Sequence, residues 1–253
     1  RHSNIEHDYF KHLAKSEKKL LKKLYLKLEA GKLKNFESVI SHADLILAVN
    51  ECDVSYFKDK FPKVKTEFLP SFHQHNSVNI KEGKGEYILY NGNLSISENY
   101  SAVIWLINNV FNEIKTPVKI AGLNPPHFLV SEIKKHKHLE LIANPDDKKM
   151  NALIENAHIH VLHTEQATGI KLKLINVLHN GRFVVCNDKM IEGTGLKASD
   201  GLVICNSPQD FISKIESLMK LDFTSQLITE RKSQLDNFSN KKNIEKLLGL
   251  IGG

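Results

Sequence analysis

The sequence is poor in the residues that mark several classes of protein. It has 3 cysteines in 253 residues, at unrelated spacings, and a single tryptophan. An odd number of scattered cysteines forms neither a disulfide framework nor a zinc-binding pattern. Apolar runs such as residues 45–49 are far shorter than the roughly 20 residues that a membrane-spanning helix needs. We therefore expect no disulfide scaffold and no transmembrane helix, and the free thiols favour a reducing, cytoplasmic location.

What is present is typical of a soluble globular protein, with 41% hydrophobic and 25% charged residues. The net charge of +6 is unevenly placed, because residues 1–35 hold ten Lys or Arg against four Asp or Glu. Leucines near a 3.6-residue period predict a helix over residues 8–31, with lysines on its other side and Gly31 as its stop. This face is either an ordinary solvated one or a peripheral contact with anionic lipid. Nucleic acid is not expected, because the basic segment lacks interleaved aromatic residues.

From residue 84 onward, short apolar runs alternate with helical patterns. Strands are predicted at residues 87–90, 118–121, 139–142, 159–162, 183–186 and 202–205. This alternation predicts an α/β fold, a doubly wound parallel sheet with helices on both faces. Two earlier strands, 45–49 and 65–69, are separated from it by the polar stretch 71–85. We therefore divide the chain into residues 1–76, residues 84–222, and a helical segment over residues 223–253.

The loops that follow the predicted strands are the natural place for a ligand, because parallel sheets bind ligands beyond their carboxyl ends. Residues 91–95, 122–126, 143–146 and 163–169 form these loops. In the last one, Gly169 and Lys171 lead directly into a helix, whose free N–H groups and dipole suit a diphosphate. A tight turn followed by a helix with solvated lysines would give the same pattern.

The order of these segments resembles a known family. From Tyr87 onward the chain is similar to the C-terminal domain of GT-B nucleotide-sugar glycosyltransferases, in the large retaining group. The resemblance rests on residues 90–94, 99–106, 120–122, 168–176, Gly181 and 192–196. Residues 4–70 resemble the end of the N-terminal domain of the same family, through residues 4–7, 42–44 and 69–70.

The resemblance implies transfer of a sugar, with retention, from a nucleotide-sugar to a glycan or lipid-linked acceptor in a cleft between two domains. It implies no metal and no cofactor. Gly92 and Asn93 would approach the donor phosphates, Gly169 and Lys171 would bind the diphosphate, Asn144 would face the nucleobase, and Glu165 would lie near the sugar. The donor-binding residues expected in this way are Gly92, Asn93, Gly122, Asn144, Glu165, Thr168, Gly169, Lys171 and Asn176.

Two departures from the family qualify this interpretation. Asn176 stands where the family usually has a glutamate that binds the ribose, which puts donor affinity in question. Only about one strand–helix unit precedes residue 70, so we expect the front of the N-terminal domain, with the acceptor site and the catalytic residues, to lie outside this chain. The sequence identifies no catalytic residue.

Two other functions are compatible with parts of the sequence, a binding module and an epimerase. A degenerate, non-catalytic module that binds a nucleotide or a partner would also fit Asn176. A GT-B-type epimerase ranks last, because no pair of acid and base groups is placed at the sugar. His158 and His160 share one face of a strand, but no further ligand completes a metal site.

Overall fold

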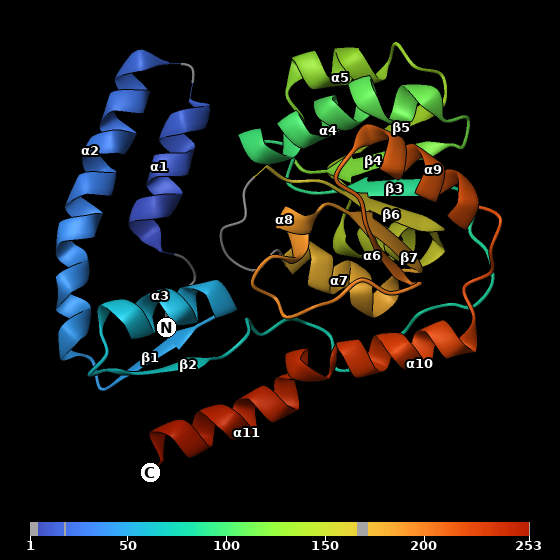
Figure 1. Cartoon of the computed structure of the whole chain (residues 1–253). Helices are drawn as coiled ribbons and strands as arrows, with labels where there is room; N and C mark the ends of the chain where they lie inside the picture. Colours follow the sequence, from blue (N-terminus) through green and yellow to red (C-terminus); the bar gives the residue numbers. More distant parts are fainter. Residues whose placement is uncertain (1–4, 18, 166–171, 253) are drawn as a thin grey trace.

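The computed structural model describes residues 5–17, 19–165 and 172–252 (Figure 1). Its centre is a parallel sheet of six strands in the order β5-β4-β3-β6-β7-β8. The strands are β3 (Ile88–Asn91), β4 (Val118–Gly122), β5 (Leu139–Ala143), β6 (Ile159–Leu162), β7 (Phe183–Cys186) and β8 (Leu202–Ile204). The strand order reverses between β3 and β6, as in doubly wound nucleotide-binding sheets. The predicted α/β fold class is confirmed.

Helices cover both faces of this sheet (Figure 1). On one face, α4 (Ser97–Asn109), the short turn η2 (Phe111–Glu113), α5 (His127–Ile133) and α9 (Pro208–Leu218) pack in a large apolar cluster. On the other face lie α6 (Asp147–Asn156), α7 (Leu172–Asn180) and the one-turn α8 (Asp188–Ile191). The strands are buried on both sides, which explains why their sequences are continuous apolar runs rather than alternating ones.

A smaller two-stranded parallel sheet precedes the large one. It pairs β1 (Leu45–Ala48) with β2 (Lys65–Phe68), and α3 (Glu51–Lys60) connects the two strands. Asn50 caps α3, because its side chain accepts a hydrogen bond of 2.7 Å from the Cys52 N–H.

The predicted single helix over residues 8–31 is wrong. The chain instead forms a hairpin of two helices, α1 (Glu6–Ser16) and α2 (Leu20–Phe36), followed by the turn η1 (Glu37–His42). Glu17 adopts an extended conformation after α1, and its carboxylate accepts a hydrogen bond from the Lys19 N–H. The two helices fold back and pack on each other, which one straight helix could not do. Gly31 lies inside α2, because a mid-helix glycine costs only about 1 kcal/mol and does not by itself end a helix.

The C-terminal segment leaves the large sheet and returns to the small one. It consists of α10 (Ser225–Gln234), the turn η3 (Asp236–Phe238) and α11 (Asn240–Ile251). Figure 1 shows α10 running below α7 and α11 continuing toward β2. The Lys246 ammonium on α11 donates a hydrogen bond of 2.8 Å to the Phe68 carbonyl. This segment therefore bridges the two sheets.

A buried arginine holds α10 in place. The Arg231 side chain is 1% exposed and donates to the carbonyls of Leu178 (3.1 Å), Arg182 (3.1 Å) and Gly201 (2.8 Å). Burial lowers the pKa of Arg231 to about 9. One guanidinium thus satisfies backbone acceptors from α7 and from the chain just before β7 and β8.

We predict that Arg231→Met lowers the free energy of unfolding by at least ~3 kcal/mol, because several buried carbonyls would lose their donor at about 1–3 kcal/mol each. Urea unfolding followed by circular dichroism measures the change. Lys232→Met, at the exposed neighbouring position on α10, is the matched control and should change stability by less than about 0.5 kcal/mol. Equal effects of the two substitutions would contradict the role assigned to Arg231.

Candidate functional site

The reversal in strand order places two loops beside each other at the carboxyl end of the sheet. Asn91 is the last residue of β3 and is followed by Gly92 and Asn93, while His163 and Thr164 follow β6. The Thr164 hydroxyl donates a hydrogen bond to the Glu98 carboxylate, which joins the end of β6 to the first turn of α4. In doubly wound sheets the crevice at this switch point is where ligands bind.

A lysine from α7 contacts the β3 loop at this switch point. The Lys173 ammonium donates a 2.8 Å hydrogen bond to the Asn99 side-chain oxygen and lies 5.3 Å from the centre of the Tyr90 ring. The Asn99 amide in turn donates to the Asn93 carbonyl at 2.9 Å. Sequence reasoning missed Lys173 and Asn99 as site residues, although both lie within the segments that carry the family resemblance. They place a positive charge at the switch point.

The loops after β3, β4 and β5 are joined through close backbone contacts. A Cβ atom at Gly122 would lie 1.9 Å from the Gly92 carbonyl oxygen, so only glycine permits this approach. The Asn144 N–H donates to the Gly122 carbonyl at 2.9 Å, and the Asn144 side-chain oxygen accepts from the Asn124 N–H at 2.7 Å. Four of the predicted donor-binding residues, Gly92, Asn93, Gly122 and Asn144, therefore lie along one edge of the sheet.

Glu165 turns toward β7 instead of toward the β3 loop. Its carboxylate accepts a 2.9 Å hydrogen bond from His163 and forms a 2.9 Å ion pair with Lys189. The hydrogen bond from Lys189 lowers the pKa of Glu165, and burial lowers the pKa of His163. The expected position of Glu165 near the sugar stays a prediction, because its described contacts are with these two side chains.

These groups line a pocket of about 330 Å³ at the carboxyl ends of β6, β7 and β8. The Trp105 ring forms one wall and stacks on the His163 imidazole, with ring centres 4.1 Å apart and planes at 6°. Trp105 also packs, partly buried, against the main apolar cluster. Its stacking on His163 could not be predicted from local pattern, because the two residues lie on different elements.

The remaining predicted donor-binding residues are Asn176 of α7 and three residues that precede α7 in the sequence. Asn176 lies one turn beyond Lys173 and accepts a 2.7 Å hydrogen bond from His75 of the segment that joins the two sheets. Thr168, Gly169 and Lys171 lie outside the described residues, so the predicted diphosphate turn stays a prediction.

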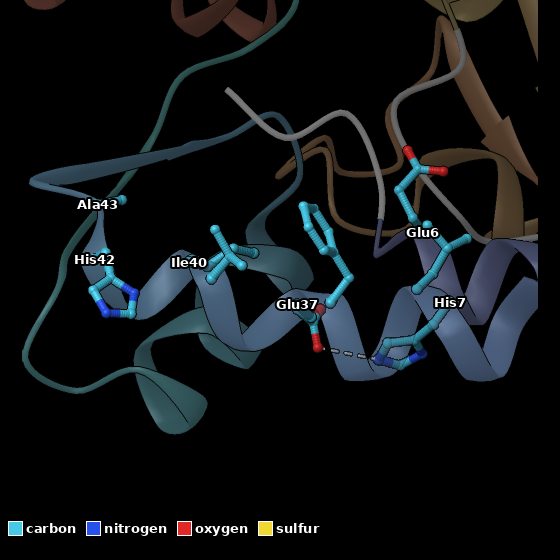
Figure 2. Close-up of a pocket in the computed structure, with 9 residues that line it drawn as sticks. Glu6, His7, Glu37, Ile40, His42 and Ala43 are labelled. Atoms are coloured by element: carbon cyan, nitrogen blue, oxygen red, sulfur yellow. Dashed lines mark ion pairs between the residues drawn. The ribbon is translucent and has the colours of Figure 1, made fainter.

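A second pocket, of about 570 Å³, lies in the α-helical hairpin region and is largely apolar. Figure 2 shows His7 and Glu37 facing each other along it, with the imidazole 3.4 Å from the carboxylate. Tyr56 donates a 2.7 Å hydrogen bond to the same carboxylate. Leu33, Phe36 and Ile40 supply much of the apolar lining. This pocket was not anticipated from the sequence, since its residues come from α1, α2 and η1.

The described residues were considered for two general features, a metal-binding cluster and a membrane-spanning helix. Among residues 5–17, 19–165 and 172–252, no group of three or more His, Cys, Asp or Glu side chains is placed to hold a metal ion. Within the same ranges, no helix combines the length and the apolar character that crossing a bilayer requires.

The chain is similar in sequence to a curated protein. No known family profile matches the chain. An uncharacterized 44.6 kDa protein in the cps region of Klebsiella pneumoniae is 27% identical over 235 residues, covering 86% of this chain and 58% of the relative. The chain therefore spans well under two thirds of the length of the curated protein it matches.

Solved glycosyltransferases share the architecture. A mutant of S. aureus TarM in complex with fondaparinux, alpha-GlcNAc-glycerol and UDP superposes with a TM-score of 0.70 at 14% identity, over 88% of this chain and 47% of that one. The pneumococcal O-GlcNAc transferase GtfA with UDP and GlcNAc gives 0.64 at 14% identity, over 86% and 47%. A Burkholderia xenovorans trehalose-phosphate synthase gives 0.62 at 9% identity, over 90% and 65%. The fold is that of GT-B glycosyltransferases.

We predict that Gly122→Ala lowers the free energy of unfolding by about 1–3 kcal/mol, because the added methyl group must push the β3 and β4 loops apart. Thermal or urea unfolding measures the effect. Gly31→Ala is the control, since a Cβ there meets nothing within 4 Å. It should stabilise α2 by up to about 1 kcal/mol. Destabilisation by Gly31→Ala, or none by Gly122→Ala, would contradict this account of the loops.

Proposed function

We propose that the protein transfers a sugar from a nucleotide-sugar to a glycan or lipid-linked acceptor, with retention at the anomeric carbon. The observation that carries the proposal is the lysine at the switch point of the sheet, where Lys173 contacts the β3 loop through Asn99. The GT-B fold supports it, and so do the structural neighbours whose complexes contain UDP.

The chemistry of the crevice suits a diphosphate donor. Because Gly92 has no side chain, its backbone lies close to Asn99, where a Cβ atom would be 3.2 Å from the Asn99 side chain, and the Lys173 ammonium that Asn99 holds supplies a positive charge beside this loop. Such preorganised charge stabilises the nucleoside diphosphate as it leaves the sugar. Lys171 and Gly169 would add to this charge and to the close approach. The donor-binding role of Asn93, Gly122, Asn144, Glu165, Thr168 and Asn176 belongs to the same proposal.

The proposal also divides the work along the chain. Residues 84–222 bind the donor, residues 1–76 belong to the acceptor side, and residues 223–253 connect the two. Hexosyl transfer, a role in polysaccharide biosynthesis and a cytoplasmic location complete it. The relative from the cps region supports the role in polysaccharide biosynthesis, and the three free cysteines support the location.

The α2 helix supports the further proposal of a peripheral contact with an anionic membrane. Leu20, Leu21, Leu24, Tyr25 and Leu28 are 56–85% exposed and share one side of α2, opposite its buried Leu26 and Ala30. Lys19 and Lys27 flank this apolar stripe and are exposed. Apolar side chains beside lysines are the composition that binds the interface of an anionic bilayer.

Donor binding is tested by calorimetric titration of the chain with UDP-, GDP- and ADP-glucose. We expect one of them to bind, and we expect Lys173→Ala to weaken that binding by about 10-fold or more, since a hydrogen bond to a charged group contributes about 1.5–3 kcal/mol. Lys220→Ala, at an exposed position in the turn that follows α9, is the control and should leave the affinity unchanged. Absence of binding by all three donors would reject the proposed function.

Membrane contact is tested by co-sedimentation with vesicles. The chain should sediment with vesicles that contain phosphatidylglycerol and stay in solution with pure phosphatidylcholine, because both the lysines and the apolar stripe contribute. The triple variant Leu20→Ser, Leu21→Ser, Leu24→Ser should abolish sedimentation. Leu248→Ser on α11 is the control, since Leu248 is also well exposed, at 59%. Equal binding to both lipids, or an unaffected triple variant, would overturn the contact.

A further inference from the structure

A polar stripe on α7 connects the switch point to the segment that joins the two sheets. Lys173, Asn176 and Asn180 are spaced i, i+3 and i+7, which places them on one side of the helix. Lys173 contacts the β3 loop through Asn99 at 2.8 Å. Asn176 and Asn180, further along the same side, contact His75 of the connecting segment. The stripe therefore has the candidate donor site at one end and the connection between the sheets at the other.

His75 is held firmly against this stripe. Its Nε2 donates a 2.7 Å hydrogen bond to the Asn176 side-chain oxygen, and its Nδ1 accepts from the Asn180 amide at 3.2 Å. Its ring stacks on the His179 ring of α7, with centres 5.1 Å apart and planes at 21°. Both ring nitrogens and one ring face are thus engaged by α7 itself.

The backbone on the other side of His75 is anchored as well. The Asn240 side chain donates to the His73 carbonyl at 2.6 Å and to the His75 carbonyl at 3.3 Å, and His73 donates to the Phe238 carbonyl at 2.8 Å. The connecting segment is therefore clamped between α7 and the start of α11.

These contacts fix which group Asn176 can offer to a ligand. The Asn176 side-chain oxygen accepts from His75 at 2.7 Å and from the Asn180 amide at 3.4 Å, which uses both of its lone pairs. The group that remains for a ligand is the Nδ2 amide, which can only donate. A glutamate at this position would offer acceptor oxygens only. Desolvation lowers the pKa of His75, against the effect of its hydrogen bond to Asn176, so the neutral ring with a proton on Nε2 is favoured.

We propose, resting on the proposed function above, that His75 is a positioning residue for the nucleotide-sugar. It turns the Asn176 amide so that Nδ2 donates a hydrogen bond to an acceptor oxygen of the bound donor. Through His75, donor binding and the placement of the connecting segment become coupled, because the same imidazole holds both.

The test compares His75→Ala with His75→Gln in the complete chain, using calorimetric titration with UDP, GDP and ADP. Glutamine can place its Nε2 amide where the imidazole Nε2 stands, so it keeps the donor to Asn176. We expect His75→Ala to weaken binding of the nucleotide that the wild type prefers by about 3- to 10-fold, the value of one net hydrogen bond. His75→Gln should restore affinity to within about 2-fold of the wild type.

A double-mutant cycle separates positioning from a general structural effect. Asn176→Ala alone should weaken binding as much as His75→Ala, and the double variant should lose no more than either single variant, because both changes remove the same contact. His138→Ala is the control, since its imidazole also donates to a backbone carbonyl (Phe111, 2.8 Å) but lies away from α7. It should leave nucleotide affinity unchanged.

The outcomes distinguish the two proposals. If the wild type binds a nucleotide but His75→Ala does not change the affinity, or glutamine fails to rescue it, or the losses add in the double variant, the positioning role is overturned and the proposed function stands. If the wild type binds none of the three nucleotides, both are overturned.

Discussion

The reversal of winding between β3 and β6 is the constraint on which the candidate site depends. Right-handed crossovers carry the chain from β3 through α4 to β4 on one face, and from β6 through α7 to β7 on the other. The two helices therefore leave neighbouring strands in opposite directions, and neither covers the sheet edge between them. Lys173 from α7 and Asn99 from α4 meet across this edge. The crevice is a product of topology, and its side chains only determine which ligand fits it.

Much of the large sheet could be predicted because its information is local. Each strand is a short apolar run bounded by turn residues, and burial on both faces makes such runs easy to recognise. The Asn50 cap and the loops at the carboxyl ends follow from the same kind of short-range pattern. The helical hairpin could not be predicted in this way. Whether a leucine-rich segment continues as one helix or folds back as two depends on the surface of the folded protein against which its apolar side packs.

The parts of the site that escaped prediction all involve contacts between distant residues. Nothing local distinguishes Arg231 from the solvated Lys232 beside it, yet only Arg231 enters the core. The side chain of Glu165 could have turned to either neighbouring loop, and Lys189 decides the direction. His75 is 101 residues from Asn176 and lies in a stretch that reads as polar linker. Sequence pattern places residues at the correct end of the sheet, but it does not say which partner each one takes.

The contacts of Asn176 change how this residue is interpreted. Compared with the family pattern alone, it is a missing acidic group. In the structure, the His75 imidazole points its N–H at the Asn176 oxygen, and His73, His179 and Arg231 add to the positive or ionisable groups nearby. A neutral amide can accept from His75 and still donate to a ligand, whereas a carboxylate would draw a proton onto the histidine.

The two sheets are also held together by contacts between residues that are distant in the sequence. Asn50 donates to the Glu192 carbonyl, and Gly193, at φ 72°, lies so near that a Cβ there would be 2.0 Å from the Asn50 side-chain oxygen. Lys246 ties α11 to β2, and His75 ties the connecting segment to α7. Each contact joins a different part of the small sheet's surroundings to the large sheet. Because one of them ends at Asn176, the segment that joins the two sheets and the candidate donor site share a hydrogen bond.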